Sequence, residues 1–322
     1  MLDVRSPGEY FAAHIPGAYS FPLFTDDERK VIGTAYKQKS RKDAIKIGLD
    51  VFGPNLRKMV EDAEAIATSN SKILLVHCWR GGMRSAAVAW LLDLYGFKVY
   101  TLTGGYKTFR NWVLAQFEKD YLFKILGGYT GSGKTIIIQN LEKKKIPVID
   151  LEKIANHKGS AFGAIGEDQQ PRQEMFENRL AVELFFKSEN NASIWLEDES
   201  QRVGAMIIPK NIWDKMRNSP VYFLDIPFDE RLKYLVSTYG KYKKDELVSA
   251  TMRIQKRLGG LQTKEAINYL LEDNFEACFS ILLHYYDKLY SKGLQNRHNL
   301  DQLLNRISCE TVTSENQIKI LQ

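Results

Sequence analysis

The sequence is poor in cysteine. Its 322 residues contain only Cys78, Cys278 and Cys309, and no two of them stand in a Cys-x-x-Cys spacing. An odd number of cysteines without such a pair argues against a disulfide scaffold and against a structural zinc site. We therefore expect reduced thiols.

Long hydrophobic runs are also missing. The chain has no stretch of about eighteen or more apolar residues, the length that a membrane-spanning helix needs. Met1-Leu2-Asp3 does not begin a signal-peptide pattern. From these two observations we expect a cytoplasmic protein without membrane contact.

A strong excess of one charge is absent as well. Lysine and arginine number 45 against 39 acidic residues, which gives a formal net charge of +6. A balance this mild is compatible with RNA binding but is also common in ordinary enzymes. No internal repeat or low-complexity tract occurs, and the length with 44% hydrophobic residues predicts two packed domains.

The pattern around Cys78 is the first candidate for chemistry. An apolar run at 73–76 leads into the sequence HCWRGGMRS at 77–85, and a helix-period apolar run follows at 86–92. This order predicts a buried strand, a tight loop and the N-terminus of a helix. Cys78 would then lie at the mouth of an anion site.

The loop residues suit a reactive thiolate. Loop amides and the positive end of a helix dipole stabilise an anion, and Arg80 and Arg84 would add positive charge. Gly81 and Gly82 let the backbone approach an anion closely. The alternative is a small buried cysteine after a strand, which does not require two arginines and two glycines beside it.

The N-terminal segment resembles the rhodanese family. It carries Asp-Val-Arg at 3–5, Glu-Tyr at 9–10 and His-Ile-Pro-Gly-Ala at 14–18, followed about sixty residues later by the cysteine loop. The Gly-Gly at 104–105 after an expected strand fits the end of such a domain. We place this domain at 1–118. The strand before residue 3 is almost missing, so we expect a few further N-terminal residues to complete it.

Two charged stretches leave alternatives open. The segment 24–56 is either a solvated helical insertion or an arm that docks substrate. The segment 229–299 has a helical pattern with basic and aromatic residues interleaved. It could contact RNA phosphates and bases, or it could be a solvated face over core aromatics, and composition alone favours the latter. Its part at 282–290 is expected to be a buried terminal helix.

A second motif begins the domain that we place at 119–322. A strand candidate at 121–126 is followed by Gly-Gly-Tyr-Thr-Gly-Ser-Gly-Lys-Thr at 127–135 and an apolar helix start. This satisfies the P-loop pattern in its strand, loop and helix context. Its amides would cradle a diphosphate or triphosphate, its lysine would neutralise the charge and its threonine would hold Mg²⁺. The motif residues are Gly128, Gly131, Gly133, Lys134 and Thr135.

Further strands at 147–150, 193–199 and 221–226 complete a predicted parallel sheet, so the fold class is α/β in both domains, with a helical C-terminal region. One of Glu197, Asp198 and Glu199 is expected to hold Mg²⁺. The glycine-rich loop 156–166 contains His157 and Ser160. It is either a flexible connection or, as we favour, a substrate contact at the ligand-binding edge of the sheet.

The combination of both motifs with Asp-Leu-Glu at 150–152 and Ala-Asn-His-Lys-Gly-Ser-Ala-Phe-Gly at 155–163 resembles the tRNA 2-selenouridine synthase family over nearly the whole chain. The resemblance implies a transferase that acts on wobble 2-thiouridine in tRNA and replaces sulfur with selenium from selenophosphate. It also implies geranyl transfer from geranyl diphosphate, with S-geranyl-2-thiouridine as an intermediate.

Mapped onto this sequence, the resemblance implies that Cys78, its two arginines and the glycine amides handle selenophosphate. Lys134 and Thr135 would then bind the diphosphate of the prenyl donor, although the motif fits ATP or GTP equally well. We expect no tightly bound cofactor, with Mg²⁺ as an option. The expected partners are the tRNA and an enzyme that supplies selenophosphate.

Two other functions fit the residues. Five residues separate Cys78 from Arg84, which is the spacing of cysteine phosphatases of the rhodanese fold, so a phosphatase fused to a nucleotide-binding module is the main alternative. A regulatory protein that senses ligands at both loops without turnover is the third hypothesis.

Overall fold

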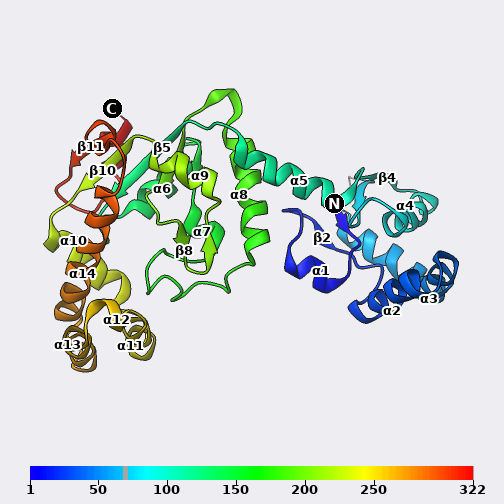
Figure 1. Ribbon diagram of the computed structural model, residues 1–322, viewed down its shortest axis with the longest axis horizontal. Coiled ribbons are helices and arrows are strands. Elements are labelled where there is room, and N and C mark those ends of the chain that lie inside the picture. Colours follow the sequence, from blue (N-terminus) through cyan, green and yellow to red (C-terminus); the bar gives the residue numbers. More distant parts are fainter. Residues whose placement is uncertain (68–71, 322) are drawn as a thin grey trace. The chain divides into compact units, whose positions relative to one another are not determined.

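The computed structural model describes residues 1–67 and 72–321, and the chain divides into two compact units, Met1–Ala115 and Gln116–Gln322. The division falls within helix α5 (Gly105–Glu118). Each unit has its own parallel sheet flanked by helices (Figure 1). The predicted α/β class is confirmed.

The first unit is built on a four-stranded parallel sheet of order β2-β1-β3-β4. The central strand β3 (Ile73–His77) is the predicted apolar run. Its neighbours are β1 (Leu2–Asp3), β2 (Tyr19–Ser20) and β4 (Lys98–Thr101). The helices are α1 (Pro7–Ala12), α2 (Asp26–Gln38), α3 (Arg41–Ile66) and α4 (Met83–Tyr95).

The charged segment 24–56 is helical. Thr25 caps α2 and Ser40 caps α3, each by accepting a hydrogen bond from a backbone amide. Their charged faces are solvated, but Phe52 and Met59 of α3 are buried in the core of the unit. One face of helix α3 is therefore part of the domain core.

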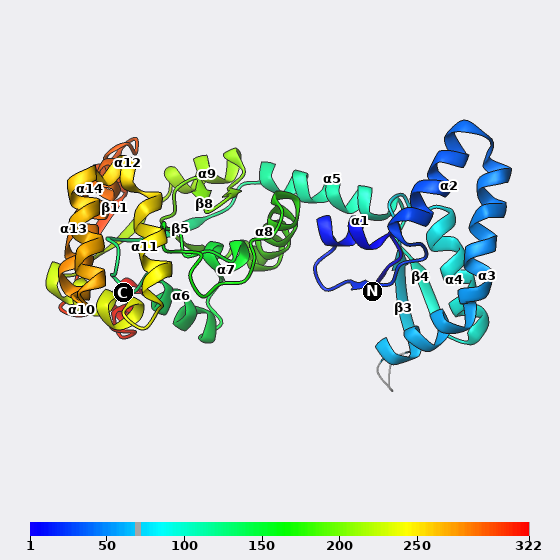
Figure 2. The same cartoon turned by 90° about the horizontal axis from the view of Figure 1, so that it is seen from below.

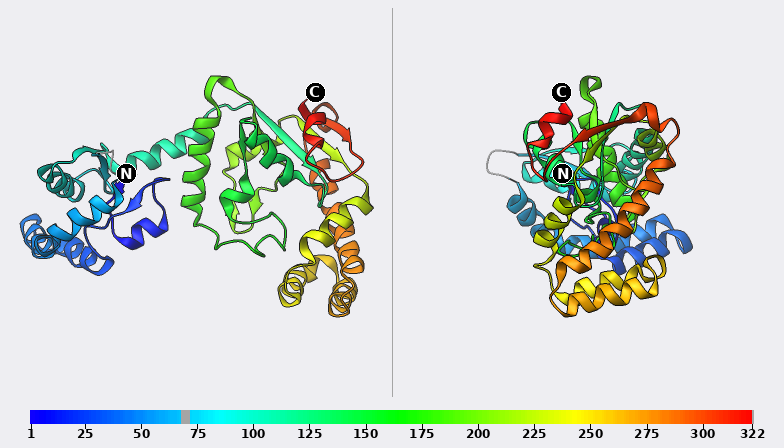
Figure 3. Two further views of the ribbon diagram at one scale, coloured as in Figure 1. Left: turned by 180° about the vertical axis from the view of Figure 1, so that it is seen from behind. Right: turned by 90° about the vertical axis from the view of Figure 1, so that its left-hand side faces the viewer.

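The second unit is built on a five-stranded parallel sheet of order β11-β10-β5-β7-β6. Four of its strands are those predicted: β5 (Phe123–Gly128), β6 (Val148–Ile149), β7 (Ile194–Glu197) and β10 (Val221–Asp225). The prediction that β10 ends the sheet is wrong, because β11 (Leu304–Ser308) pairs along its length (Figure 3). This edge strand is largely polar and so carried no hydrophobic signal.

Helices cover this sheet and form a separate bundle at one end of the unit (Figure 2). Those near the sheet are α6 (Lys134–Lys143), α7 (Leu151–Ala155), α8 (Gln173–Lys187), α9 (Lys210–Arg217) and α16 (Asn316–Leu321). The bundle comprises α10 (Phe228–Tyr239), α11 (Lys244–Arg253), α12 (Gln255–Leu258), α13 (Gly260–Leu271) and α14 (Phe275–Gln295). The remaining elements are the 3-10 turn Glu189–Asn191, the hairpin β8 (Arg202–Val203) and β9 (Met206–Ile207), and α15 (Leu300–Leu303).

The bundle has its own apolar core, drawn from α10 to α14 and from the loop that contains Phe162. The predicted helix at 282–290 lies within α14, where Leu282 and Leu283 are buried but Leu289 is exposed. It is not terminal, because β11 follows it. Within residues 1–67 and 72–321, no helix combines the length and the apolar character needed to cross a membrane.

Candidate active sites in the two units

Cys78 lies directly after β3, with 3% of its surface exposed. Its Sγ is 3.3 Å from Ser85 Oγ and accepts a hydrogen bond of 3.3 Å from the amide of Gly82. Gly81 has a positive φ of 65° that permits the tight turn. The predicted order of strand, loop and helix N-terminus is confirmed.

A second glycine turn supports the cysteine loop. Gly105 has a φ of 59°, and a Cβ placed there would lie 2.3 Å from the carbonyl oxygen of Cys78. The amide of Tyr106 donates a 2.9 Å hydrogen bond to that oxygen. The Gly-Gly at 104–105 is therefore needed for close packing against the loop.

The thiol of Cys78 is tuned by hydrogen bonds. Burial raises its pKa, but hydrogen bonds from the Ser85 side chain and from the amides of Ser85, Arg80 and Gly82 outweigh burial and hold the pKa below its ordinary value. The thiolate was expected, but the Ser85 hydroxyl was not named as its partner. Ser85 directly follows the motif arginine, and that position was the available signal.

The two arginines of the loop differ in their surroundings. Arg84 Nη1 forms a 2.8 Å ion pair with Glu9, which also pairs with Arg29. Arg80 is exposed and forms no ion pair with the described residues. The positive charge of Arg80 is therefore available to a ligand, whereas that of Arg84 is paired with Glu9 of α1.

A buried ionic pair lies beneath the loop, in the Asp-Val-Arg segment. Asp3 and Arg5 are almost fully buried and are joined by a 2.6 Å ion pair. The Arg5 guanidinium stacks 3.9 Å from the centre of the Tyr106 ring, and Asp3 Oδ2 is 3.8 Å from Nε2 of His77. This pair ties β1 to His77, which precedes Cys78, and to Tyr106, whose amide binds the Cys78 carbonyl.

Replacing Ser85 with alanine is expected to raise the pKa of Cys78, because a hydrogen bond to the charged form is lost. Wild-type Cys78 ionises below the ordinary thiol pKa, whereas in the variant the thiolate would form at higher pH. The rate of alkylation of Cys78, followed against pH by peptide mass spectrometry, measures this shift. Cys278 has a pKa raised by burial and serves as the slow internal reference; an unchanged profile would contradict the assignment.

The P-loop lies between β5 and α6, as predicted. Gly128, Gly131 and Gly133 all have positive φ values, of 148°, 81° and 74°. A Cβ at Gly131 would lie 2.9 Å from the carbonyl oxygen of Arg231, so the loop is packed closely against α10. Lys134 Nζ donates a 2.9 Å hydrogen bond to the carbonyl of Gly128 and so bends back over the loop.

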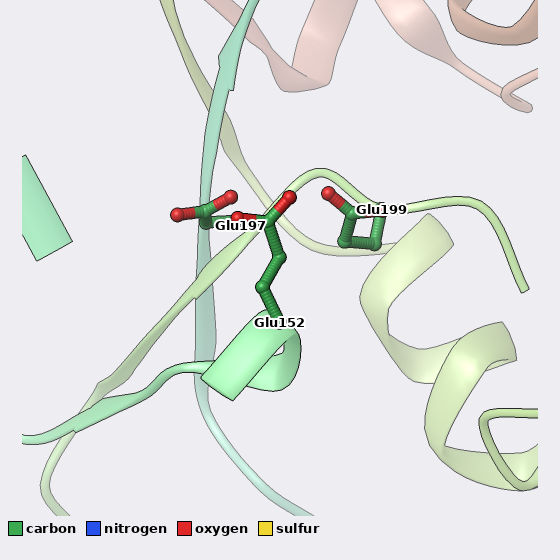
Figure 4. A group of neighbouring side chains, drawn as sticks. All are labelled: Glu152, Glu197 and Glu199. Carbon is green, nitrogen blue, oxygen red and sulfur yellow. The ribbon is translucent and has the colours of Figure 1, made fainter. Parts of the chain in front are cut away.

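Three carboxylates converge next to this loop. Glu152 from α7, Glu197 at the end of β7 and Glu199 each offer an oxygen within 4.8 Å of the others (Figure 4). The sequence predicted Glu197 and Glu199 as candidates but missed Glu152, which follows a different strand. Thr135 Oγ1 donates a 3.3 Å hydrogen bond to Glu152, which brings the P-loop threonine to the same cluster.

Asp198 has a different place. Its Oδ2 accepts a 2.7 Å hydrogen bond from Tyr290, and its Oδ1 is paired with Nη2 of Arg297. Tyr290 also accepts a 3.2 Å hydrogen bond from the amide of Gly128. Asp198 therefore anchors α14 and the residues after it to the P-loop.

The acidic cluster fits a divalent cation. Burial, and then repulsion by Glu199, raise the pKa of Glu152, while burial and the neighbouring carboxylates place the pKa of Glu197 well above its ordinary value. Glu197 is 1% exposed, and its Oε1 has no hydrogen-bond partner among the described residues. Carboxylate oxygens beside a hydroxyl are ligands that Mg²⁺ accepts.

A buried arginine fixes the back of the P-loop. Arg231 of α10 donates to both carboxylate oxygens of Asp287 at 2.9 and 2.8 Å, and to the carbonyl of Thr130 at 3.1 Å. Arg231 thereby joins α10, α14 and the P-loop.

Replacing Arg231 with methionine is expected to lower the free energy of unfolding of the second unit by about 3 kcal/mol, because it leaves a partly buried Asp287 without its partner. Chemical denaturation measures the loss. Lys233→Met, at an exposed ion pair on the same helix, is the control and is expected to leave the free energy of unfolding close to that of the wild type. Equal losses for the two variants would contradict the role of the buried pair.

The glycine-rich loop 156–166 follows α7 rather than a strand. Ser160 lines a cavity beside the P-loop, whereas His157 is not among the lining residues. A Cβ at Gly163 would lie 2.7 Å from the His157 ring, and Nδ1 of that ring is buried without a partner among the described residues. The structure thus brings Ser160, but not His157, to the site.

The cavity has a volume of about 850 Å³ and two kinds of wall. The P-loop residues 130–135 and the three glutamates form its polar floor. Helices α10 and α14 supply an aromatic and aliphatic wall that consists of Tyr234, Leu235, Tyr239, Tyr286, Leu289 and Tyr290. The site can therefore hold a phosphorylated group and an apolar group together.

Comparisons with known proteins identify the family of each unit. Residues 122–316 match the family model of the tRNA 2-selenouridine synthase AAA domain, and residues 1–111 match the rhodanese-like domain. The chain belongs to the tRNA 2-selenouridine synthase family. The confirmed resemblance extends over both units.

Individual relatives of the family align over nearly full length. A tRNA 2-selenouridine synthase of Sulfurovum sp. (strain NBC37-1) is 32% identical, with 97% of this chain and 93% of the relative covered. The one from Hydrogenovibrio crunogenus is also 32% identical, covering 92% and 90%. The N-terminal domain of a putative ATP/GTP binding protein from Clostridium difficile 630 is a solved structure 41% identical over 35% of this chain and 87% of that chain, with a TM-score of 0.34.

Proposed function

We propose that this protein converts 2-thiouridine at the wobble position of tRNA into 2-selenouridine, with geranyl diphosphate and selenophosphate as co-substrates. Family membership supports the tRNA reaction. The observation that carries the choice of prenyl donor is a cavity lined both by the P-loop and by aromatic side chains of α10 and α14. A nucleotide would use the floor, but a geranyl chain would also bury its apolar surface on the wall.

The first step takes place in this cavity. The sulfur of 2-thiouridine attacks C1 of geranyl diphosphate, so a C–S bond forms, the C–O bond breaks and diphosphate leaves with the electron pair. The N3 proton of the base passes to water. The P-loop amides and Lys134 stabilise the charge that develops on the leaving diphosphate.

Mg²⁺ fits the floor of the cavity. Glu152, Glu197, Glu199 and the hydroxyl of Thr135 would hold it. When bound, the cation supplies positive charge next to the leaving diphosphate. Burying three carboxylate charges side by side costs free energy unless a cation compensates them. A bound cation would therefore allow the three glutamates to ionise together.

The second step takes place at the cysteine loop. The Cys78 thiolate attacks the phosphorus of selenophosphate, so an S–P bond forms, the P–Se bond breaks and selenide leaves with the electron pair. Selenide adds to C2 of the geranylated base and displaces geranyl thiolate. Water then hydrolyses the thiophosphate to free Cys78 and phosphate. Arg80 and the glycine amides bind the phosphoryl oxygens, and Ser85 stabilises the sulfur as nucleophile and leaving group.

Nucleoside mass spectrometry tests the proposal. Anticodon stem-loop RNA that carries 2-thiouridine is incubated with the protein, geranyl diphosphate, selenophosphate and Mg²⁺. We expect 2-selenouridine, preceded by the geranylated nucleoside. Unchanged 2-thiouridine with folded protein would overturn the proposal. ATP is expected to leave geranyl transfer unaffected at equal concentration, and strong competition by ATP would assign the P-loop to a nucleotide instead.

The phosphatase alternative rests on the spacing of Cys78 and Arg84. The same thiolate attack on phosphorus would hydrolyse a phosphoester. Hydrolysis of a generic phosphoester that is lost in Cys78→Ser, together with unchanged RNA, would favour this alternative.

A further inference from the structure

The lining of the cavity includes a second set of polar side chains besides the three glutamates. This set is formed by Trp213 and Arg217 of α9 and by Arg297, which follows α14. Arg297 is 6% exposed and donates through Nη1 to the carbonyls of Met216 and Arg217, at 2.9 and 3.0 Å. The backbone at the end of α9 thus fixes the guanidinium of Arg297.

Two buried donors in this region lack an acceptor. Among the described residues, neither Nε of Arg297 nor Nε1 of Trp213 has a hydrogen-bond partner. Both side chains line the cavity. Because a buried N–H without an acceptor costs free energy, this pair of donors points to a ligand that accepts hydrogen bonds.

The charge of the region is positive. Asp198 neutralises Arg297, but Arg217 forms no ion pair with the described residues. Its Nη2 donates a 2.9 Å hydrogen bond to the carbonyl of Gly293. Burial, followed by the positive charge of Arg297, lowers the pKa of Arg217 against the opposing charge of Asp198, yet a guanidinium remains charged at neutral pH. Asp198 acts on both arginines, so the positive charge that remains is that of one guanidinium, and together with the two donors it defines an anion site.

We propose that Arg217, Arg297 and Trp213 form a second anion subsite, which binds a backbone phosphate of the RNA beside the target nucleotide. In the proposed function the P-loop already binds the diphosphate of geranyl diphosphate. We therefore assign the anion of this second region to the RNA. The inference rests on the proposed function, since it takes RNA as the substrate. It adds the residues that position the strand.

The subsite is linked to the P-loop by hydrogen bonds. Arg297 pairs with Asp198, Asp198 accepts from Tyr290, and Tyr290 accepts from the amide of Gly128. This connected chain places the RNA-binding arginine and the diphosphate-binding loop on one rigid support. It also gives Asp198 a function outside the glutamate cluster.

Two variants isolate the subsite. Arg217→Gln removes one positive charge. Trp213→Phe removes the indole N–H, which has no partner among the described residues, and keeps a smaller aromatic ring beside the Arg217 guanidinium, which lies 5.6 Å from the centre of the Trp213 ring. Lys292→Gln, at an exposed lysine of α14 outside the cavity wall, is the matched control. Binding of 2-thiouridine stem-loop RNA is measured by fluorescence anisotropy at several salt concentrations, together with geranyl diphosphate affinity and thermal melting.

We expect Arg217→Gln to weaken RNA binding about tenfold and to reduce the salt slope by about 0.7 to 0.9, the value for one phosphate contact. Trp213→Phe is expected to weaken RNA binding about threefold. Melting temperature and geranyl diphosphate affinity should remain those of the wild type.

Other results would overturn the inference. If Arg217→Gln binds RNA like Lys292→Gln, with the same salt slope, the subsite does not contact RNA. If geranyl diphosphate affinity falls instead, the anion belongs to the prenyl donor. If the wild-type protein neither binds nor modifies the RNA, the proposed function itself fails and the inference fails with it.

Discussion

Lys134→Ala is expected to reduce geranyl transfer to 2-thiouridine RNA by about a hundredfold to a thousandfold. Lys134 Nζ now contacts the carbonyl of Gly128, across the loop whose amides would face the diphosphate. Removing this charge removes stabilisation of the leaving group, which is worth about that factor. Initial rates of S-geranyl-2-thiouridine formation, measured by nucleoside mass spectrometry, give the effect.

Lys143→Ala is the control for this variant, because Lys143 is an exposed residue in the last turn of the same helix. Its rate should equal that of the wild type. A Lys134→Ala protein that melts normally and still geranylates RNA at the wild-type rate would remove the P-loop from the reaction.

Cys78→Ala is expected to abolish 2-selenouridine formation, with a loss of more than about a thousandfold, because a covalent nucleophile is removed. The geranylated nucleoside should accumulate in its place. Retained geranyl transfer serves as the internal control for folding and RNA binding. Formation of 2-selenouridine at the wild-type rate by this variant would exclude Cys78 as the nucleophile.

Local patterns predicted much of the fold and parts of both sites. The strand before Cys78, the helix after it and the P-loop between β5 and α6 all stand where the sequence placed them. Each is defined by neighbouring residues: an apolar run, glycines at positive φ and a helix-period pattern. Such signals survive in any tertiary context.

Other parts of the sites depend on contacts between distant segments. Glu152 joins Glu197 only because β6 and β7 are neighbours in the sheet. In the sequence Asp198 is equivalent to its acidic neighbours. In the structure its carboxylate binds Tyr290 and Arg297 and is not part of the glutamate cluster. No periodicity predicts such pairings, because they arise from strand order and helix packing.

The anion sites illustrate the same distinction. The sequence suggested that arginines would stabilise the Cys78 thiolate, whereas the sulfur is contacted by a hydroxyl and by amides. Arg84 was expected to face the phosphate, yet it is paired with Glu9 of α1. A charged residue in a motif indicates the chemistry that is available, but its ion-pair partner depends on the tertiary packing.

The central claim is that the P-loop unit and the cysteine unit perform separate steps on one nucleoside. The most direct test is sequential: RNA geranylated by Cys78→Ala is purified and then given to Lys134→Ala with selenophosphate and no prenyl donor. The account predicts 2-selenouridine at close to the wild-type rate. Geranylated RNA that stays unchanged, while wild-type protein converts it under the same conditions, would contradict the division of the two steps.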